Sequence, residues 1–165
     1  MWSFAIYDKE QQTVFCSRDR FGVKPFYYTE QEDVFLFTSE IKQFFEILDA
    51  HPKANRNTLL QYIIRENIDY SSETMFRHIF QLPAGHNLTY DIKFKKYKIE
   101  KYYDIRCIKE KAELYKDACE EFRRALYNSV DLRLRTDVPV GYCLSGGLDA
   151  AAIVCMADEI IHSVC

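Results

Sequence analysis

The 165-residue sequence lacks the features that would place a chain in or across a membrane. No apolar run approaches the roughly 20 residues of a membrane-spanning helix. Residues 1–7 have neither the charged start nor the long apolar stretch of a targeting peptide. The net charge of −3 and the pI of about 5.8 give no electrostatic case for a nucleic-acid partner or an anionic membrane. These absences predict a cytoplasmic protein with no nucleic-acid and no membrane partner.

The sequence also lacks a cysteine framework and a metal motif. No two cysteines form a C-x-x-C pair, and no secretory signal accompanies them. We therefore predict reduced thiols that mostly fill cores, namely Cys16, Cys107, Cys119, Cys143, Cys155 and Cys165. Cys16 and Cys143 fall in expected strands, which favours packing over a nucleophilic role. The four histidines are scattered and show no metal-ligand spacing.

Aromatic residues, in contrast, are abundant. They make up 15% of the chain, with twelve Tyr and twelve Phe, which is enough for a sizeable core. Alternating apolar and polar residues predict strands at 2–7, 14–17, 26–28, 34–38, 87–90 and 93–103. Short helices are predicted after an N-cap at Ser39 and over 58–65. The many lysines of 93–103 indicate an edge strand or a solvated face.

A charged loop follows the second predicted strand and contains Arg18, Asp19 and Lys24. These three residues could form a catalytic cluster. A loop held together by ion pairs, which fastens the hairpin to the next strand, is the favoured interpretation.

The last third of the sequence changes pattern. A long helix is predicted over 110–134, a buried strand over 140–144, a tight loop over 145–148 and a second helix over 149–161. This order predicts the first unit of a parallel α/β sheet. One such unit cannot bury both faces of its strand, so we expect the chain to stop before this second domain is complete. The fold class expected from the residues is therefore α+β followed by α/β.

The segment that indicates chemistry is VPVGYCLSGGLD, residues 138–149. Two adjacent glycines permit a sharp turn, so that successive N–H groups point into one small volume beside a helix N-terminus. A serine hydroxyl and a carboxylate could then contact phosphate oxygens and Mg²⁺. The spacing differs from a Walker A loop, and a Gly-Gly turn alone is more often only a turn. The predicted phosphate cradle consists of Ser145, Gly146, Gly147, Leu148 and Asp149.

This segment resembles the pyrophosphate-binding loop of the glutamine-hydrolysing asparagine synthetase family. A second motif, RDRFGVKPFYY at 18–28, resembles one found late in the class II glutamine amidotransferase domain. Two further matches follow in order, SEIK at 39–42 and LPAGH at 82–86, and YYD at 102–104 looks like the strand that ends the domain. The resemblance covers nearly the whole chain.

The resemblance implies a two-domain organisation. Residues 1–104 would be the C-terminal portion of an amidotransferase domain, the later part of an Ntn-hydrolase-type αββα sandwich. Residues 110–165 would begin an ATP-pyrophosphatase domain with an adenine-nucleotide-hydrolase-like (Rossmann-like) parallel sheet. The implied reaction forms asparagine from aspartate through an aspartyl-adenylate, with ammonia from glutamine and with ATP and Mg²⁺ as cofactors. Asp149 would hold Mg²⁺ through the phosphates, and the full-length parent could form a homodimer.

Two departures limit what residues 1–165 are expected to catalyse. The family's usual Ser-Ser after the loop aspartate is Ala150-Ala151 here, which removes two hydroxyl donors. The family's nucleophilic N-terminal cysteine has no counterpart, because residue 2 is Trp, so no catalytic residue is assigned. Two alternatives stay open: a non-catalytic remnant that binds another polypeptide, and a related ATP-dependent amide-forming enzyme such as a β-lactam synthetase.

Overall fold

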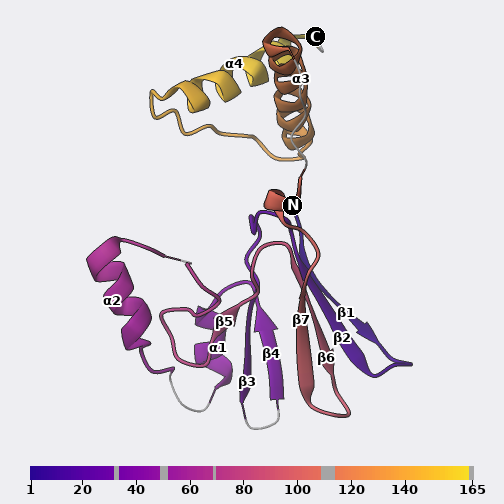
Figure 1. The fold of residues 1–165 in the computed structure, drawn as a ribbon, viewed down its shortest axis with the longest axis vertical. Helices are drawn as coiled ribbons and strands as arrows, with labels where there is room; N and C mark the ends of the chain where they lie inside the picture. Colours follow the sequence, from indigo (N-terminus) through magenta and orange to yellow (C-terminus); the bar gives the residue numbers. More distant parts are fainter. Residues whose placement is uncertain (32–33, 49–51, 69, 109–113, 164–165) are drawn as a thin grey trace. The chain divides into compact units, whose positions relative to one another are not determined.

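The computed structural model describes residues 1–31, 34–48, 52–68, 70–108 and 114–163. The chain divides into two compact units, Met1–Ile108 (unit 1) and Lys109–Cys165 (unit 2). Unit 1 contains mixed α/β structure with antiparallel sheets, as the sequence predicts in outline, and unit 2 is helical in its described part (Figure 1). Among the described residues, no helix has both the length and the apolar character needed to cross a membrane.

The larger sheet of unit 1 has four antiparallel strands in the order β1-β2-β6-β7 (Figure 1). Their bounds are Ser3–Asp8, Thr13–Arg18, His86–Asp91 and Lys96–Lys101. The register sets Ala5 beside Cys16, Cys16 beside Leu88 and Leu88 beside Ile99. Because side chains alternate between the faces of a strand, this row lies on one face of the sheet. The row that starts at Phe4 lies on the other face.

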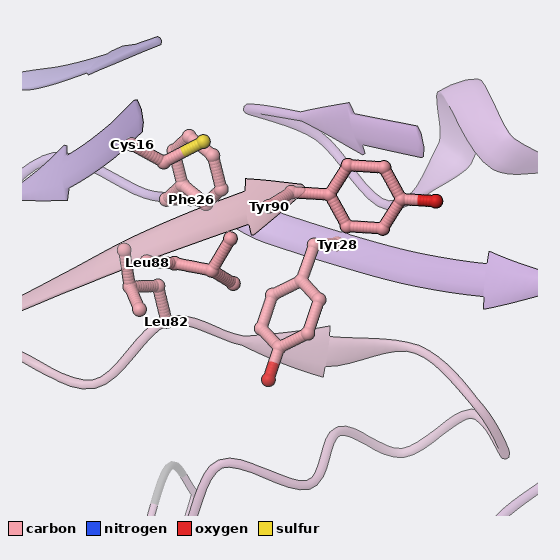
Figure 2. Packing of buried hydrophobic residues seen from close by; sticks show 6 residues of the cluster. All are labelled: Cys16, Phe26, Tyr28, Leu82, Leu88 and Tyr90. Atoms are coloured by element: carbon pink, nitrogen blue, oxygen red, sulfur yellow. The ribbon is translucent and has the colours of Figure 1, made fainter. Parts of the chain in front are cut away.

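The smaller sheet has three strands in the order β4-β3-β5. Their bounds are Val34–Thr38, Tyr27–Gln31 and Phe80–Gln81. Aromatic rings join the two sheets: Phe35 stacks on Tyr90 at 4.4 Å between ring centroids, and Tyr28 meets Tyr97 edge-on at 5.5 Å. The main hydrophobic core therefore draws on both sheets, and Figure 2 shows its buried members, Cys16, Phe26, Tyr28, Leu82, Leu88 and Tyr90.

Two short helices complete unit 1, and their starts differ from the prediction. Helix α1 (Lys42–Ile47) begins after Ile41, with no side-chain cap, so the N-cap predicted at Ser39 is wrong. Helix α2 (Arg56–Arg65) begins two residues earlier than expected. The side chain of Asn55 accepts a hydrogen bond from the N–H of Asn57 there and caps the helix.

Strand β7 is an edge strand, as its lysines predict. It ends at Lys101, however, so the expectation that residues 102–104 belong to a strand is wrong. Instead Asp104 caps a short 3-10 helix, η1 (Ile105–Cys107), by accepting a hydrogen bond from the N–H of Arg106 at 3.0 Å. Arg106 and Lys101 also donate to this carboxylate, and these hydrogen bonds hold the pKa of Asp104 well below its usual value.

Unit 2 contains helices α3 (Tyr115–Leu134) and α4 (Leu148–Ser163). Both were predicted, although the expected start of the first helix at 110 lies outside the described residues. The strand predicted over 140–144 is wrong, because this segment has no regular secondary structure, is exposed and has no sheet partner among the described residues. Strand structure needs inter-strand hydrogen bonds, and the described part of unit 2 offers none to this segment. A small core lies between the helices, formed by Val130, Ala157 and Ile160.

The prediction that the cysteines mostly fill cores is also wrong. Cys16 is fully buried, whereas Cys107, Cys119, Cys143 and Cys155 are exposed, and all five are free thiols. Cys165 lies outside the described residues. Cys143 was assigned to a buried strand, and it is exposed because that strand does not form.

Candidate functional site: a glycine turn and a backbone-bonded loop

The predicted phosphate loop is a turn that leads directly into helix α4. Gly146 has φ +83°, a left-handed conformation that glycine adopts without strain. Apart from Gly146 itself and its two chain neighbours, no atom of the structure lies within 4 Å of the position where a Cβ at Gly146 would be. A Cβ at Gly147 would meet only Ser145 Oγ, at 3.6 Å. The space beside the turn is therefore open, and a small anion could approach the backbone.

The start of helix α4 supplies backbone donors next to this turn. The N–H of Ala151 donates to the carbonyl of Gly147 at 3.0 Å, which is the first α-helical bond of the helix. The preceding N–H groups, at 148–150, have no intrahelical acceptor in an α-helix. Leu148 is 85% exposed, and Asp149 lies in the first turn with its side chain in solvent. The donors that α4 leaves unused are thus accessible, and the helix dipole favours an anion there.

The same turn offers few side chains that could bind a metal ion. No group of three or more His, Cys, Asp or Glu side chains that could hold a metal ion occurs among the described residues. Asp149 is therefore the one carboxylate of the loop, which suits Mg²⁺ that takes most of its ligands from phosphate oxygens and water. Ala150 and Ala151 are half-buried and carry no hydroxyl. Anion binding here would depend on backbone N–H groups and Ser145.

The charged loop of unit 1 differs from its prediction. Asp19 is buried and accepts backbone hydrogen bonds from Phe21, Val23 and Lys24, at 2.9 to 3.1 Å. Within the described part of the chain, neither Arg18 nor Asp19 has an ion-pair partner. The expected ion-pair network is therefore wrong: the loop is fixed by hydrogen bonds between charged side chains and the backbone.

Arg18 joins three motifs that lie far apart in the sequence. Its guanidinium donates to the carbonyl oxygens of Leu82, Gly22 and Lys24 at 2.6 to 2.9 Å. The hydroxyl of Tyr102 donates to the carbonyl of Arg18 at 2.7 Å. The segments RDRFGVKP, LPAGH and YYD thus meet at one residue, the first two through its guanidinium and the third through its backbone carbonyl. Sequence reasoning missed this role for Arg18, because nothing local signals that one of its acceptors is the carbonyl of Leu82, 64 residues away.

Gly85 completes this junction. Its N–H donates to the carbonyl of Asp19 at 3.0 Å, and its own carbonyl accepts from Tyr102 and Tyr103. Gly85 has φ +68°, and a Cβ there would lie 2.9 Å from the carbonyl oxygen of Tyr103. Only glycine allows so close an approach in this conformation. The motif therefore contains Gly85 for a structural reason.

The pKa values of Asp19 and Cys16 indicate what these two buried side chains of unit 1 do. Burial alone would raise the pKa of Asp19. The backbone hydrogen bonds from Lys24, Val23, Phe21 and Trp2 together outweigh this effect, so the pKa of Asp19 lies below its usual value. Burial raises the pKa of the Cys16 thiol to about 12. A thiol with such a pKa is almost never a thiolate near neutral pH. Cys16 therefore packs the core and is no nucleophile.

Comparison with known proteins matches both parts of the chain. A family model described as a glutamine amidotransferase domain matches residues 1–103, and one described as asparagine synthase matches residues 121–164. The chain is 39% identical to a protein of Methanocaldococcus jannaschii with the provisional name glutamine-hydrolysing asparagine synthetase 2, over 96% of this chain and 31% of that protein. It is 35% and 32% identical to asparagine synthetases 2 and 1 of Bacillus subtilis, over 96% and 99% of this chain.

These relatives are much longer than the chain, which spans 22% and 25% of the two Bacillus subtilis proteins. The amidotransferase model covers more than half of the 165 residues, and the asparagine synthase model follows it in the order that the sequence motifs predict. On these matches, the chain belongs to the glutamine-hydrolysing asparagine synthetase family.

Proposed function

We propose that this chain forms part of a glutamine-dependent asparagine synthetase that acts in the cytoplasm. In that reaction ATP activates the side-chain carboxyl group of aspartate as an adenylate, and ammonia released from glutamine then forms the amide. Residues 1–104 would contribute the later part of an Ntn-hydrolase-type αββα amidotransferase domain. Residues 110–165 would begin the Rossmann-like ATP-pyrophosphatase domain.

The turn around Gly146 carries this proposal. It combines a left-handed glycine, open space beside the backbone and the unused N–H groups of a helix start. Ser145, Gly146, Gly147 and Leu148 would bind the pyrophosphate part of ATP through backbone N–H groups and one hydroxyl. Asp149 would hold Mg²⁺ beside the phosphates. The ion neutralises phosphate charge when bound, and the chain's own residues orient the phosphates.

The exposure of the turn predicts weak binding by residues 1–165. Donors that point into solvent must exchange water for phosphate, and Ala150 and Ala151 add no hydroxyl. We expect residues 1–165 to release no glutamate from glutamine, because residue 2 is Trp, so the family's nucleophilic N-terminal cysteine has no counterpart, and the buried thiol of Cys16 cannot replace it. Glutamate release above a buffer control would contradict this.

Calorimetric titration with pyrophosphate in the presence of Mg²⁺ tests the loop assignment. The double variant Ala150→Ser with Ala151→Ser should bind several-fold tighter, because each hydroxyl adds a donor in the first turn of α4. Cys155→Ser is a matched control: it adds a hydroxyl to the same helix at an exposed position beyond the first turn. Equal affinities of the double variant and the control would refute the proposed phosphate site.

A further inference from the structure

Unit 1 contains an open recess of about 410 Å³ that has no role in the proposed reaction. Its polar wall is formed by Arg18, Tyr70, Ser71, Ser72 and Gln81, which all belong to unit 1. A recess of this volume can hold an organic molecule of amino-acid size. The charge and the hydrogen-bond donors of its wall indicate which chemical class fits it.

Arg18 supplies a positive charge to the recess, and one of its donors is unused. Its Nε donates to the carbonyl of Lys24, its Nη1 to the carbonyl of Leu82 and to Gln81 Oε1, and its Nη2 to the carbonyl of Gly22. A guanidinium has five N–H groups, so one N–H of Nη2 has no acceptor among the described residues. No carboxylate in the described part of the chain forms an ion pair with Arg18. Its charge is therefore available to an anion.

Gln81 holds the polar wall in place. Its side chain is buried; Oε1 accepts from Arg18 at 3.3 Å, and Nε2 donates to the carbonyl of Ser71 at 2.9 Å. Its backbone N–H donates to the carbonyl of Ser72 at 2.8 Å. The hydroxyl oxygen of Ser71 accepts from the N–H of Glu73 at 3.1 Å, which leaves the hydroxyl hydrogen to donate elsewhere. The donors are thus ordered before a ligand arrives, and this lowers the entropic cost of binding.

The remaining wall of the recess is mostly apolar. Phe21, Pro83 and Ala84 line it, together with the backbone of Gly22. A Cβ at Gly22 would lie 3.1 Å from the Cβ of Ala84 and 3.2 Å from Nη2 of Arg18. Glycine therefore keeps space open beside the guanidinium. A ligand with a charged end and an apolar body matches the two kinds of wall.

We propose that this recess binds a small organic monocarboxylate. The carboxylate accepts from the unused N–H of Arg18 and from the hydroxyls of Ser71 and Ser72. The carbon body packs against Phe21 and Pro83. One guanidinium balances one negative charge, which favours a monocarboxylate over the more highly charged phosphate.

The recess also disfavours amino acids. No Asp or Glu occurs among the described residues that line it, so nothing there neutralises an ammonium group. The proposed ligand therefore lacks an amino group. All the residues involved belong to unit 1, so the proposal does not depend on the phosphate loop of unit 2.

Three probes with one carbon skeleton test the ligand class: phenylpropionate, its neutral amide and phenylalanine. We expect NMR titration of residues 1–165 with phenylpropionate to shift the backbone amides at 18–22, 71–72 and 81–84. The Kd of the amide should be about tenfold higher or more, because it loses the charge-assisted hydrogen bonds. The Kd of phenylalanine should also be several-fold higher, because its ammonium group lies near Arg18 without a counter-charge.

Matched leucine substitutions test the location. Ala84 is exposed and lines the recess, so Ala84→Leu places a larger side chain in it. Ala118 is exposed on α3 and lies outside the recess, so Ala118→Leu adds the same apolar surface elsewhere. We expect the Kd of phenylpropionate to rise by about tenfold or more in Ala84→Leu and to stay unchanged in Ala118→Leu. Ser72→Ala removes one donor and should raise the Kd several-fold, a test that leaves the volume of the recess nearly unchanged.

Equal Kd values for phenylpropionate and its amide would overturn the proposal, as would equal values for Ala84→Leu and Ala118→Leu. Shifts confined to residues outside the recess would also overturn it. Tighter binding of inorganic phosphate than of phenylpropionate would refute the assignment to a monocarboxylate.

Discussion

The two units bury their apolar side chains to different extents. In unit 1, two hydrogen-bonded sheets hold residues such as Leu82 and Leu88 completely out of solvent. In unit 2, the core between the helices is formed by Val130, Ala157 and Ile160, and large side chains elsewhere on the helices stay exposed. Sheets bury residues when their strands are paired on both sides, and residues 140–144 pair with no strand in the described part of unit 2. The segment with the phosphate-loop motif thus lies in the less stabilised unit, where local opening costs little.

The largest expected difference comes from the same substitution in both units. Leu88→Ala removes a fully buried side chain from the core of unit 1 and should lower the free energy of unfolding by about 3 kcal/mol or more. Leu132→Ala in α3 removes a side chain that is 49% exposed and should cost about 1 kcal/mol or less, since alanine favours helix. Denaturant unfolding measures both losses, and equal losses would mean that unit 2 is as well packed as unit 1.

Glycine substitutions give the next largest effect. Gly85→Ala in unit 1 places a Cβ 2.9 Å from the Tyr103 carbonyl oxygen in a left-handed conformation. The strain and the clash together should lower the free energy of unfolding by about 3 kcal/mol. Gly146→Ala in unit 2 should lower the free energy of unfolding by only about 1 kcal/mol. It adds strain from the left-handed conformation but no clash, because the space beside Gly146 is open.

Thermal unfolding monitored separately in each unit by amide exchange distinguishes these two glycines. Loss of protection in β7 and in residues 18–24 should accompany Gly85→Ala. A larger global loss for Gly146→Ala than for Gly85→Ala would contradict the open geometry around the Gly146 turn.

Asp19→Asn tests the charged loop that stabilises unit 1. An amide can replace one carboxylate oxygen but turns its NH₂ group toward a backbone N–H, so we expect a loss of about 2 kcal/mol at pH 7. Because the folded-state pKa of Asp19 is lowered, its contribution is present above the unfolded-state pKa of about 3.9 and is lost as the pH falls through the folded-state value.

The pH dependence provides the control for that variant. The parent chain should lose stability between about pH 4 and lower values, and Asp19→Asn should lose less over the same range. Parallel acid profiles for the two proteins would show that Asp19 has the same pKa in both states.

The strands of unit 1 were predictable because apolar and polar residues alternate within each strand's own sequence. The strand over 34–38 was predicted with its observed bounds, and β2 and β6 were predicted to within a residue or two at each end. The pairing of β2 with β6 was not predictable, since the two strands are about 70 residues apart. The strand over 140–144 failed for the same reason, because local composition predicts a preference for strand, whereas a strand forms only with a partner.

The turn at the candidate site was predictable because the conformational freedom of glycine depends on the residue itself and not on distant contacts. Gly146 adopts the left-handed turn that adjacent glycines permit, and α4 starts directly after Gly147. The roles of Arg18 and Asp19 were missed, because both act through carbonyl and N–H groups that every residue carries. Because every residue carries these backbone groups, the pattern of side chains cannot indicate which of them Arg18 and Asp19 bind. Only the structure identifies this junction.

The smallest expected effect concerns the exposed face of α3. Phe122 is 69% exposed, in contrast to Phe44 of unit 1, which is 1% exposed. Phenylalanine and serine have similar helix propensities, so Phe122→Ser changes little except apolar surface. We expect its free energy of unfolding to stay within about 0.5 kcal/mol of the parent value, whereas Phe44→Ser should destabilise unit 1 strongly. Chemical denaturation at two protein concentrations measures both, and a loss for Phe122→Ser that grows with concentration would show that another molecule covers this face in solution.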